Sequence, residues 1–273
     1  MQRDLLGTAY DLDGAGPTLV LIHGMGLNRN MWDGFLDDLT ANFQIVRYDL
    51  LGHGESPSPS ELCDLNHLLD QLRHLLNEIG VERAAVAGFS LGGTLALAMA
   101  AKYPELTAAI AVMNSANRRD SKQRASMEER LRLTHEQGPA GTVNAAIERW
   151  FTDDFRASRP DVTRIVRDWI LANDPDDYAA IYRVLVEGDD FVLPDGRILA
   201  DALPDIDCPA LILTGEHDAN STPAMTNAMA KVIPNGQATI IPRLRHMGLA
   251  EDPKLFLNEL LPFFNSVFGT SRA

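Results

Sequence analysis

The sequence predicts an α/β fold in which a mostly parallel central sheet carries helices on both faces. Short β-branched and apolar runs alternate along the chain with longer segments of helical spacing, which is the order of a parallel sheet with crossover helices. A G-x-S-x-G pattern at residues 88–92 lies between one apolar run and a helical segment. From about residue 117 to residue 190 the alternation stops and helical segments replace it. We therefore expect a helical lid inserted after the sixth core strand.

The length suits one α/β core that carries an insertion. The chain has 273 residues, of which 45% are hydrophobic, enough for a sizeable core. The composition shift divides it into a core of residues 1–116 and 201–273 and a helical cap, or lid, of residues 117–200.

Charge and cysteine content exclude several classes of partner. The net charge of −14 argues against binding nucleic acid or an anionic membrane surface. Cys63 and Cys208 are far apart in the sequence, so we expect two small buried hydrophobes rather than a disulfide or a metal site. Residues 1–30 lack the basic start and apolar stretch of a signal peptide, and no run approaches the ~20 apolar residues of a membrane span. We expect a cytoplasmic protein that acts on a small molecule without metal or cofactor, as a monomer or homodimer.

The elements of the first half follow in order. The first sixteen residues are typical of an edge strand or hairpin, closed by the turn at residues 14–17. Leucines at helical spacing predict a long amphipathic helix that ends at Gly80. The expected strands are 18–22, 44–48, 84–87 and 108–113, and the expected helices are 31–43, 65–79 and 90–102.

Prolines divide the second half. Gly138-Pro139, Arg159-Pro160 and Asp174-Pro175 predict breaks between the helices of the lid. Residues 189–198 are typical of an extra hairpin or loop, and then the alternation resumes. The expected strands are 210–214 and 238–241, and the expected helices are 223–232 and 252–268.

The G-x-S-x-G pattern has the strand–turn–helix context of a nucleophile elbow. Such a turn is too tight for Cβ atoms at Gly88 and Gly92, and glycine adopts the necessary backbone angles at low cost. Ser90 is then expected at the apex, with its hydroxyl exposed above the sheet.

Five motifs, each at the end of an expected strand, carry a resemblance to a known family. They are H-G-M-G (23–26), D-L-L-G-H-G-E-S (49–56), G-F-S-L-G-G (88–93), G-E-H-D (215–218) and R-H-M (245–247). In these motifs and their order the chain resembles the α/β-hydrolase family over nearly all of its length. The resemblance implies a serine nucleophile, an acid and a histidine, in that order along the chain.

The resemblance assigns roles to three side chains. A serine hydroxyl is a poor nucleophile until a base takes its proton, and His246 is the expected base. Asp218 would orient the imidazole and stabilise its protonated form. Glu216 is a rival for the acid, whereas Asn114, at the position some relatives use after the sixth strand, cannot carry the charge. His53 and His217 are expected to be structural.

The attack creates an oxyanion that two backbone N–H groups can stabilise, each by roughly 3 kcal/mol. The resemblance implies Leu91, directly after the nucleophile, and Met25 in the loop of residues 23–26. Their side chains have no part in this role.

The lid narrows the expected activity. The segment from Glu148 to Thr152 and the residues around Asn173 and Tyr178 look similar to those of 3-oxoadipate enol-lactonases and small carboxylesterases. We therefore expect a serine hydrolase that cleaves a small carboxylic ester or (enol-)lactone through an acyl-enzyme on Ser90. The expected substrate pocket is formed by Phe89, Trp150 and Met247.

Two other functions stay open at this stage. One is a carbon–carbon bond hydrolase of a ring-cleavage pathway, although relatives of that kind usually carry Asn where this chain has Phe89. The other is a ligand receptor on the same fold. Arg149 or Arg183 could meet a substrate carboxylate, but for both we expect solvated helix faces.

Overall fold

A computed structural model describes residues 1–59 and 63–270 of the chain. It contains an eight-stranded sheet in the order β1-β2-β4-β3-β5-β6-β7-β8. β1 pairs antiparallel with β2, and β2 pairs antiparallel with β4. The other neighbouring strands of the sheet, from β4 to β8 in the order given, pair parallel. The strands are β1 (Gln2–Arg3), β2 (Ala9–Gly14), β3 (Thr18–Ile22), β4 (Gln44–Tyr48), β5 (Ala84–Phe89), β6 (Thr107–Met113), β7 (Ala210–Gly215) and β8 (Gly236–Ile241). The predicted α/β class is confirmed.

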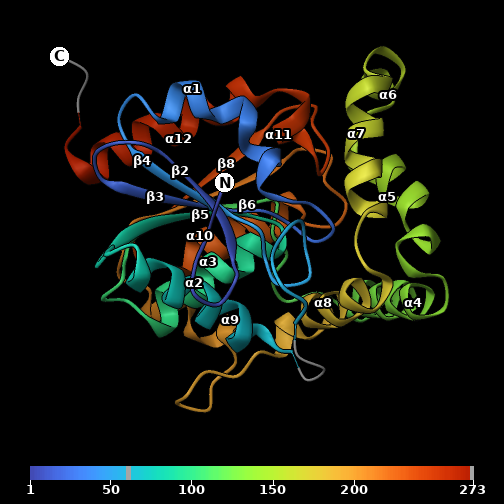
Figure 1. Cartoon of the computed structure of the whole chain (residues 1–273), viewed down its shortest axis with the longest axis horizontal. Helices are drawn as coiled ribbons and strands as arrows, with labels where there is room; N and C mark the ends of the chain where they lie inside the picture. The colour runs from blue at the N-terminus through green and yellow to red at the C-terminus, as the bar shows by residue number, and fades with distance from the viewer. Residues whose placement is uncertain (60–62, 271–273) are drawn as a thin grey trace.

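Helices cover both faces of the sheet (Figure 1). The helices α1 (Leu36–Leu39) and α12 (Pro253–Phe268) lie on one side, and α2 (Leu65–Glu78), α3 (Leu91–Lys102) and α10 (Pro223–Val232) lie on the other. Because both faces are covered, β3, β5 and β7 are buried along their whole length. This explains why the sequence shows continuous apolar runs there rather than alternation. Apart from the segment after β3, the core elements differ from their predicted bounds by a residue or two at most.

The segment after β3 differs from prediction in its type of helix. Instead of one α-helix over residues 31–43, a 3-10 helix, η1 (Arg29–Phe35), leads into the single α-helical turn α1. The buried side chains of η1 are Arg29, Trp32 and Phe35, at steps of three. This is the period of a 3-10 helix, and it places the rings of Trp32 and Phe35 in edge-on contact, 5.5 Å between centroids.

The predicted helical insertion follows β6, and Figure 1 shows it beyond one end of the sheet. Breaks fall at Gly138, Pro160 and Pro175, as predicted. An isolated bridge between Val192 and Ile198 forms the small hairpin expected at residues 189–198. The helices are α4 (Ser121–Gln137), η2 (Gly138–Gly141), α5 (Val143–Trp150), α6 (Asp153–Ser158), α7 (Pro160–Leu171) and α8 (Pro175–Glu187), then η3 (Gly188–Asp190), α9 (Leu199–Ala202) and η4 (Leu203–Asp205).

Neither a helix suited to cross a membrane nor a disulfide bond occurs in the part of the chain that the structure describes. Within residues 1–59 and 63–270, no helix is both long and apolar enough to cross a membrane. Both cysteines are free; Cys63 is buried and Cys208 is half-buried.

The turn from β5 into α3 depends on close backbone packing. A Cβ atom on Gly88 would lie 1.9 Å from the carbonyl oxygen of Gly92, and one on Gly92 would lie 2.3 Å from that of Ile22. Between them Ser90 adopts φ 55° and ψ −112°, in a region that L-residues rarely occupy. The two glycines therefore allow α3 to begin directly against β3 and β5.

We predict that Gly88→Ala lowers the free energy of unfolding by about 3 kcal/mol or more, because the new Cβ meets backbone atoms that cannot move aside. Urea unfolding measures the loss. Gly34→Ala is the matched control, because a Cβ there makes only ordinary contacts, at 3.5 Å from Pro253. Equal stability of the two variants would contradict the prediction.

Candidate active site

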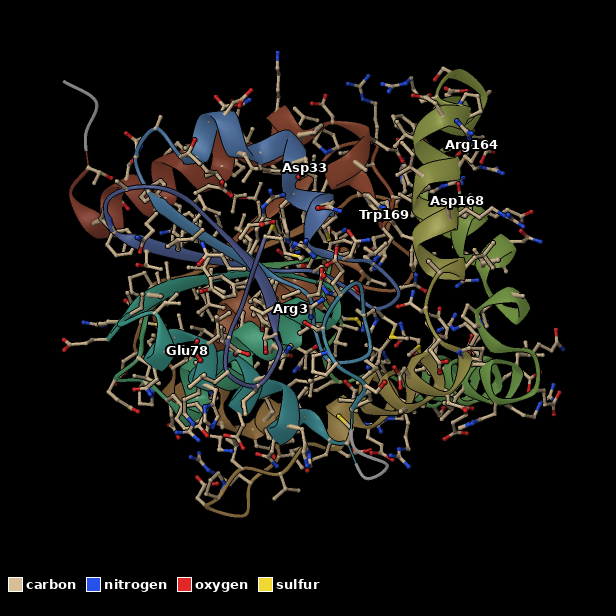
Figure 2. The ribbon with its side chains drawn as sticks, viewed as in Figure 1. Arg3, Asp33, Glu78, Arg164, Asp168 and Trp169 are labelled. Carbon is tan, nitrogen blue, oxygen red and sulfur yellow. The ribbon has the colours of Figure 1, made fainter. Side chains whose placement is uncertain are left out.

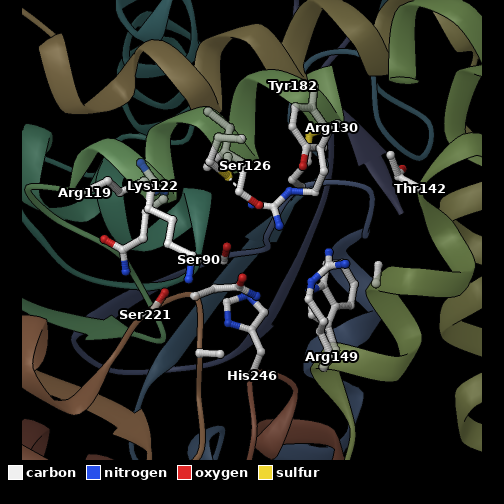
Figure 3. A pocket seen from close by; sticks show the side chains of 18 of the residues that line it. Ser90, Arg119, Lys122, Ser126, Arg130, Thr142, Arg149, Tyr182, Ser221 and His246 are labelled. Carbon is white, nitrogen blue, oxygen red and sulfur yellow. Dashed lines mark hydrogen bonds between the residues drawn. The ribbon is translucent and has the colours of Figure 1, made fainter. Parts of the chain in front are cut away.

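A cavity of about 400 Å³ lies where the lid meets the end of the sheet. Ser90 and His246 line it from the core, and residues of α4, α5 and α8 line it from the lid. Figure 3 shows Ser90 beside the imidazole of His246, with lid side chains reaching toward them. Four of the eight predicted site residues therefore line one cavity: Ser90, His246, Met25 and Trp150.

The backbone around Ser90 is fixed on both sides. Its N–H donates to the carbonyl oxygen of Met113 at 2.8 Å, and its carbonyl oxygen accepts from the N–H of Gly93 at 3.0 Å. The hydroxyl of Ser115 also donates to that carbonyl oxygen. The side chain consequently points away from the sheet, at the apex of the turn.

His246 and Asp218 form a buried pair. Nδ1 of His246 and Oδ2 of Asp218 are 2.7 Å apart, and both side chains are almost fully buried. Burial alone would raise the pKa of Asp218, but the charge of His246 and hydrogen bonds from His246, Asn114 and Ser221 outweigh it, so the pKa lies below its usual value. With Nδ1 engaged by a carboxylate, Nε2 is the ring nitrogen left to take up a proton, and His246 lines the cavity.

The three residues considered for the acid differ in their hydrogen-bond partners. Nδ2 of Asn114 donates to Oδ2 of Asp218 at 2.9 Å, so the amide after the sixth strand supports the carboxylate after the seventh. Glu216 is half-exposed and accepts instead from the N–H of Arg243 at 2.8 Å. Of the three, Asp218 is the one bonded to His246.

Two neutral histidines brace the loop that contains Met25. Nε2 of His53 accepts from the N–H of Gly26 at 2.9 Å, and Nε2 of His23 accepts from the N–H of Leu50 at 2.9 Å. Each ring donates through Nδ1 to a backbone carbonyl. The bonds cross between the loop after β3 and the loop after β4, which agrees with the structural role expected for His53.

The amides of Met25 and Leu91 are the two expected oxyanion donors. Among the hydrogen bonds of the described residues, neither amide has an acceptor within the chain. The Met25 residue lines the cavity beside Ser90, and Leu91 is the first residue of α3, where helix amides lack a partner in the helix. Both N–H groups therefore stay candidates for the two donors that the resemblance implies.

The bracing histidines make stability depend on pH. Burial lowers the pKa of His23 to about 4 and that of His53 to about 3, with the neighbouring His23 adding to the effect on His53. Histidine in the unfolded chain takes up its proton near pH 6.5. Between these values the unfolded state binds more protons, so the stabilisation is complete above about pH 6.5 and is lost as the pH falls toward 4.

We predict that the free energy of unfolding decreases by up to about 1.4 kcal/mol per pH unit for each histidine below about pH 6. Urea unfolding at a series of pH values measures this slope. His53→Gln removes one titrating group and makes the slope shallower, whereas His74→Gln, on an exposed helix face, leaves it unchanged. A slope that is the same in wild type and His53→Gln would contradict the assignment.

Comparison with known proteins places this arrangement in a family. A family model described as the alpha/beta hydrolase fold matches residues 17–253. The chain belongs to the α/β-hydrolase fold family. It is 28% identical over 242 residues to (E)-2-((N-methylformamido)methylene)succinate hydrolase of Acinetobacter baylyi, covering 87% of this chain and 86% of that one. It is 25% identical over 240 residues to 3-oxoadipate enol-lactonase 2 of the same organism, covering 88% and 85%.

Solved structures agree with this placement. An enol-lactonase from Burkholderia xenovorans superposes with a TM-score of 0.84 at 25% identity, covering 94% of this chain and 96% of that one. A malate-bound thermophilic esterase from Thermogutta terrifontis superposes with a TM-score of 0.86 at 27% identity, covering 96% and 94%. The expected resemblance to enol-lactonases and esterases is confirmed as a distant similarity.

In this α/β hydrolase the lid is tied to the loop of His246. The guanidinium of Arg245 donates to the carbonyl oxygen of Phe151 at 2.8 Å, and the N–H of Met247 donates to that of Trp150 at 2.8 Å. The ring of Trp150 lies 5.6 Å from that of His246, between centroids. Both neighbours of His246 therefore hold the end of α5.

The predicted pocket residues divide between the cavity and the core. Trp150 lines the cavity, whereas Phe89 and Met247 are buried and lie outside its lining. The ring of Phe89 packs 5.0 Å from that of His246, between centroids. Its observed contact supports the imidazole rather than bounding the cavity.

Basic side chains are the main feature of the cavity beyond the prediction. The prediction that Arg149 lies on a solvated helix face is wrong, because Arg149 is half-buried and lines the cavity. Arg183 lies outside the cavity lining. Sequence reasoning also missed Lys122 and Arg130 of α4, which line the cavity. Their helical spacing with Ser126 was the available signal, although it also fits a solvated face.

No metal site emerges from these groups. Across residues 1–59 and 63–270, no three His, Cys, Asp or Glu side chains are arranged to hold a metal ion.

Proposed function

We propose that this α/β hydrolase cleaves a small carboxylic ester or lactone through an acyl-enzyme on Ser90. The observation that carries the proposal is the 2.7 Å bond that joins Asp218 to His246, whose side chain lines the same cavity as Ser90. The similarity to an enol-lactonase and an esterase supports the bond type.

The proposed reaction has two halves. Oγ of Ser90 attacks the carbonyl carbon while Nε2 of His246 takes its proton, and Asp218 stabilises the imidazolium. The tetrahedral intermediate collapses to the acyl-enzyme as His246 returns the proton to the leaving alkoxide oxygen. Water, deprotonated by His246, then attacks the acyl carbon, and the carboxylic acid leaves as Ser90 regains its proton. In a lactone the leaving oxygen stays tethered to the acyl group.

The amides of Met25 and Leu91 form the proposed oxyanion hole. Both donors are preorganised, one by the braced loop after β3 and one by the start of α3, and each stabilises the oxyanion by roughly 3 kcal/mol. The positive end of the α3 dipole adds to this.

The lid completes the proposed site. We propose residues 117–200 as the lid and the rest of the chain as the core, with the lid as the wall that selects the substrate. A volume of about 400 Å³ suits a small ligand.

We predict that Ser90→Ala lowers kcat/KM for 4-nitrophenyl butyrate and for an enol-lactone by about 1,000-fold or more, because the acyl-enzyme cannot form. Asp218→Asn is also expected to lower kcat/KM, since the carboxamide cannot stabilise the imidazolium. Its effect is expected to be smaller than that of Ser90→Ala, because the nucleophile and the base are still present. Initial rates with Ser158→Ala, an exposed lid serine, provide the control. Wild-type turnover by Ser90→Ala would refute the mechanism.

Activity is also predicted to fall in acid, because the protonated imidazole of His246 cannot accept the proton of Ser90. The measurement is kcat/KM against pH, restricted to the range in which circular dichroism shows the fold intact. A flat profile down to about pH 4 would exclude His246 as the base.

A further inference from the structure

The cavity is basic in a strongly acidic protein. The chain carries a net charge of −14, yet the cavity lining contains one acidic side chain, Asp120. Its carboxylate is engaged at the start of α4, where it accepts from the N–H of Gln123 at 2.8 Å. The basic side chains in the lining are Arg119, Lys122, Arg130 and Arg149.

These basic groups come from two lid helices. Lys122, Ser126 and Arg130 recur at steps of four along α4 and so share one face of that helix. Arg149 comes from the last turn of α5. Figure 3 shows Arg130 and Arg149 reaching into the same space from these two helices, on the lid side of Ser90 and His246.

Arg130 and Arg149 differ from Arg119 in their partners. Arg119 is paired with Asp189 at 3.1 Å, whereas within the described residues no carboxylate lies at ion-pair distance from Arg130 or Arg149. Their Nε atoms are buried and find no acceptor in that part of the chain. Nη2 of Arg130 instead contacts the sulfur of Met127 at 2.7 Å.

Keeping these two guanidinium groups together costs free energy. Burial, and then the charge of Arg130, lower the pKa of Arg149 from its ordinary value. Two like charges that are partly removed from water are stabilised by an anion that both can bind. A carboxylate matches the planar fork of a guanidinium through two parallel hydrogen bonds.

We propose that the substrate carries a free carboxylate besides its ester or lactone bond, and that Arg130 and Arg149 bind this carboxylate. The proposal rests on the proposed function of Ser90, because it places the scissile carbonyl at Ser90 and the carboxylate under the lid. Lys122, exposed on the same face of α4, adds positive charge at this side of the cavity. The lid then selects substrates by charge as well as by size.

Paired substrates test the selection by charge. Mono-4-nitrophenyl esters of the dicarboxylic acids from succinate to pimelate carry a free carboxylate at increasing distance, and their methyl esters are neutral counterparts of nearly equal size. For the best chain length, wild type is expected to have a higher kcat/KM for the acid than for its methyl ester. Spontaneous hydrolysis, measured without protein, is subtracted.

Substitutions then locate the charge that matters. Arg130→Met and Arg149→Met are each expected to lower the ratio of kcat/KM for acid over methyl ester by about tenfold or more. Arg149→Lys keeps the charge without the fork and is expected to lie between. The control is Arg164→Met, an exposed arginine of α7 outside the cavity lining (Figure 2). An unchanged ratio in both methionine variants overturns the proposal.

Binding without turnover separates this proposal from the mechanism. Calorimetry with Ser90→Ala and the dicarboxylate of the best chain length is expected to show binding that weakens at least tenfold on Arg149→Met and weakens with added salt. If the protein carrying both Ser90→Ala and Arg149→Met binds the dicarboxylate as tightly as Ser90→Ala alone, the arginine site is refuted even if Ser90 is the nucleophile. If Arg149→Met weakens binding of the dicarboxylate but Ser90→Ala turns over esters at the wild-type rate, the mechanism is refuted and the arginine site stands. Tighter binding of inorganic phosphate than of any dicarboxylate overturns the choice of carboxylate.

Discussion

The backbone of Ser90 is the constraint on which the rest of the site depends. Its φ of 55° turns the chain from β5 into α3 within one residue. Gly88 and Gly92 allow it, because a Cβ on either would meet backbone atoms of α3 or β3. The same packing brings the start of α3 and the loop after β3 close to the serine, because a Cβ on Gly92 would meet Ile22 and one on Gly24 would lie 3.2 Å from Cβ of Ser90. In the proposed mechanism, the strained turn therefore positions the nucleophilic hydroxyl together with the two N–H donors of the oxyanion hole.

Parallel strand order extends this arrangement to the other side chains. The strands β3, β5, β6 and β7 are neighbours in the sheet, so their carboxyl ends share one edge. Asn114 follows β6 and Asp218 follows β7, and the 2.9 Å bond between them is a direct result of that adjacency. His246 reaches Asp218 from the loop after β8. Asn114 and Asp218, 104 positions apart in the sequence, therefore meet because their strands are neighbours in the sheet.

The parts of this structure that could be predicted are those with local causes. Alternating apolar runs and helical periods indicate the core strands and helices, and the glycines at 88 and 92 predict the elbow, because no other residue fits there. The type of helix at η1 could not be predicted, since apolar residues at 32, 35, 36 and 39 suit an α-helix as well as a 3-10 helix. Only the packing of Trp32 and Phe35 separates the two.

The basic residues of α4 that line the cavity, Lys122 and Arg130, could not be predicted for a related reason. Charged residues at helical spacing describe a face, but not whether that face meets water or a cavity. Lys122, Ser126 and Arg130 lie on a face of α4 that the tertiary arrangement of the lid places along the cavity. No local signal in the sequence distinguishes this face from the solvated one.

The attachment of the lid links the two halves of the proposed chemistry. Trp150 and Phe151 are held by Met247 and Arg245, the neighbours of His246. Arg149 immediately precedes this anchored pair, so the contacts that fix the end of α5 to the histidine loop also fix the arginine over the cavity. A shift of the lid at this point would move Arg149, the proposed carboxylate-binding residue, together with the contacts of His246, the proposed base. In the proposed mechanism, selection of the substrate and activation of Ser90 therefore both depend on one short junction. Its hydrogen bonds run mainly to backbone carbonyls, so it places little demand on the lid side chains.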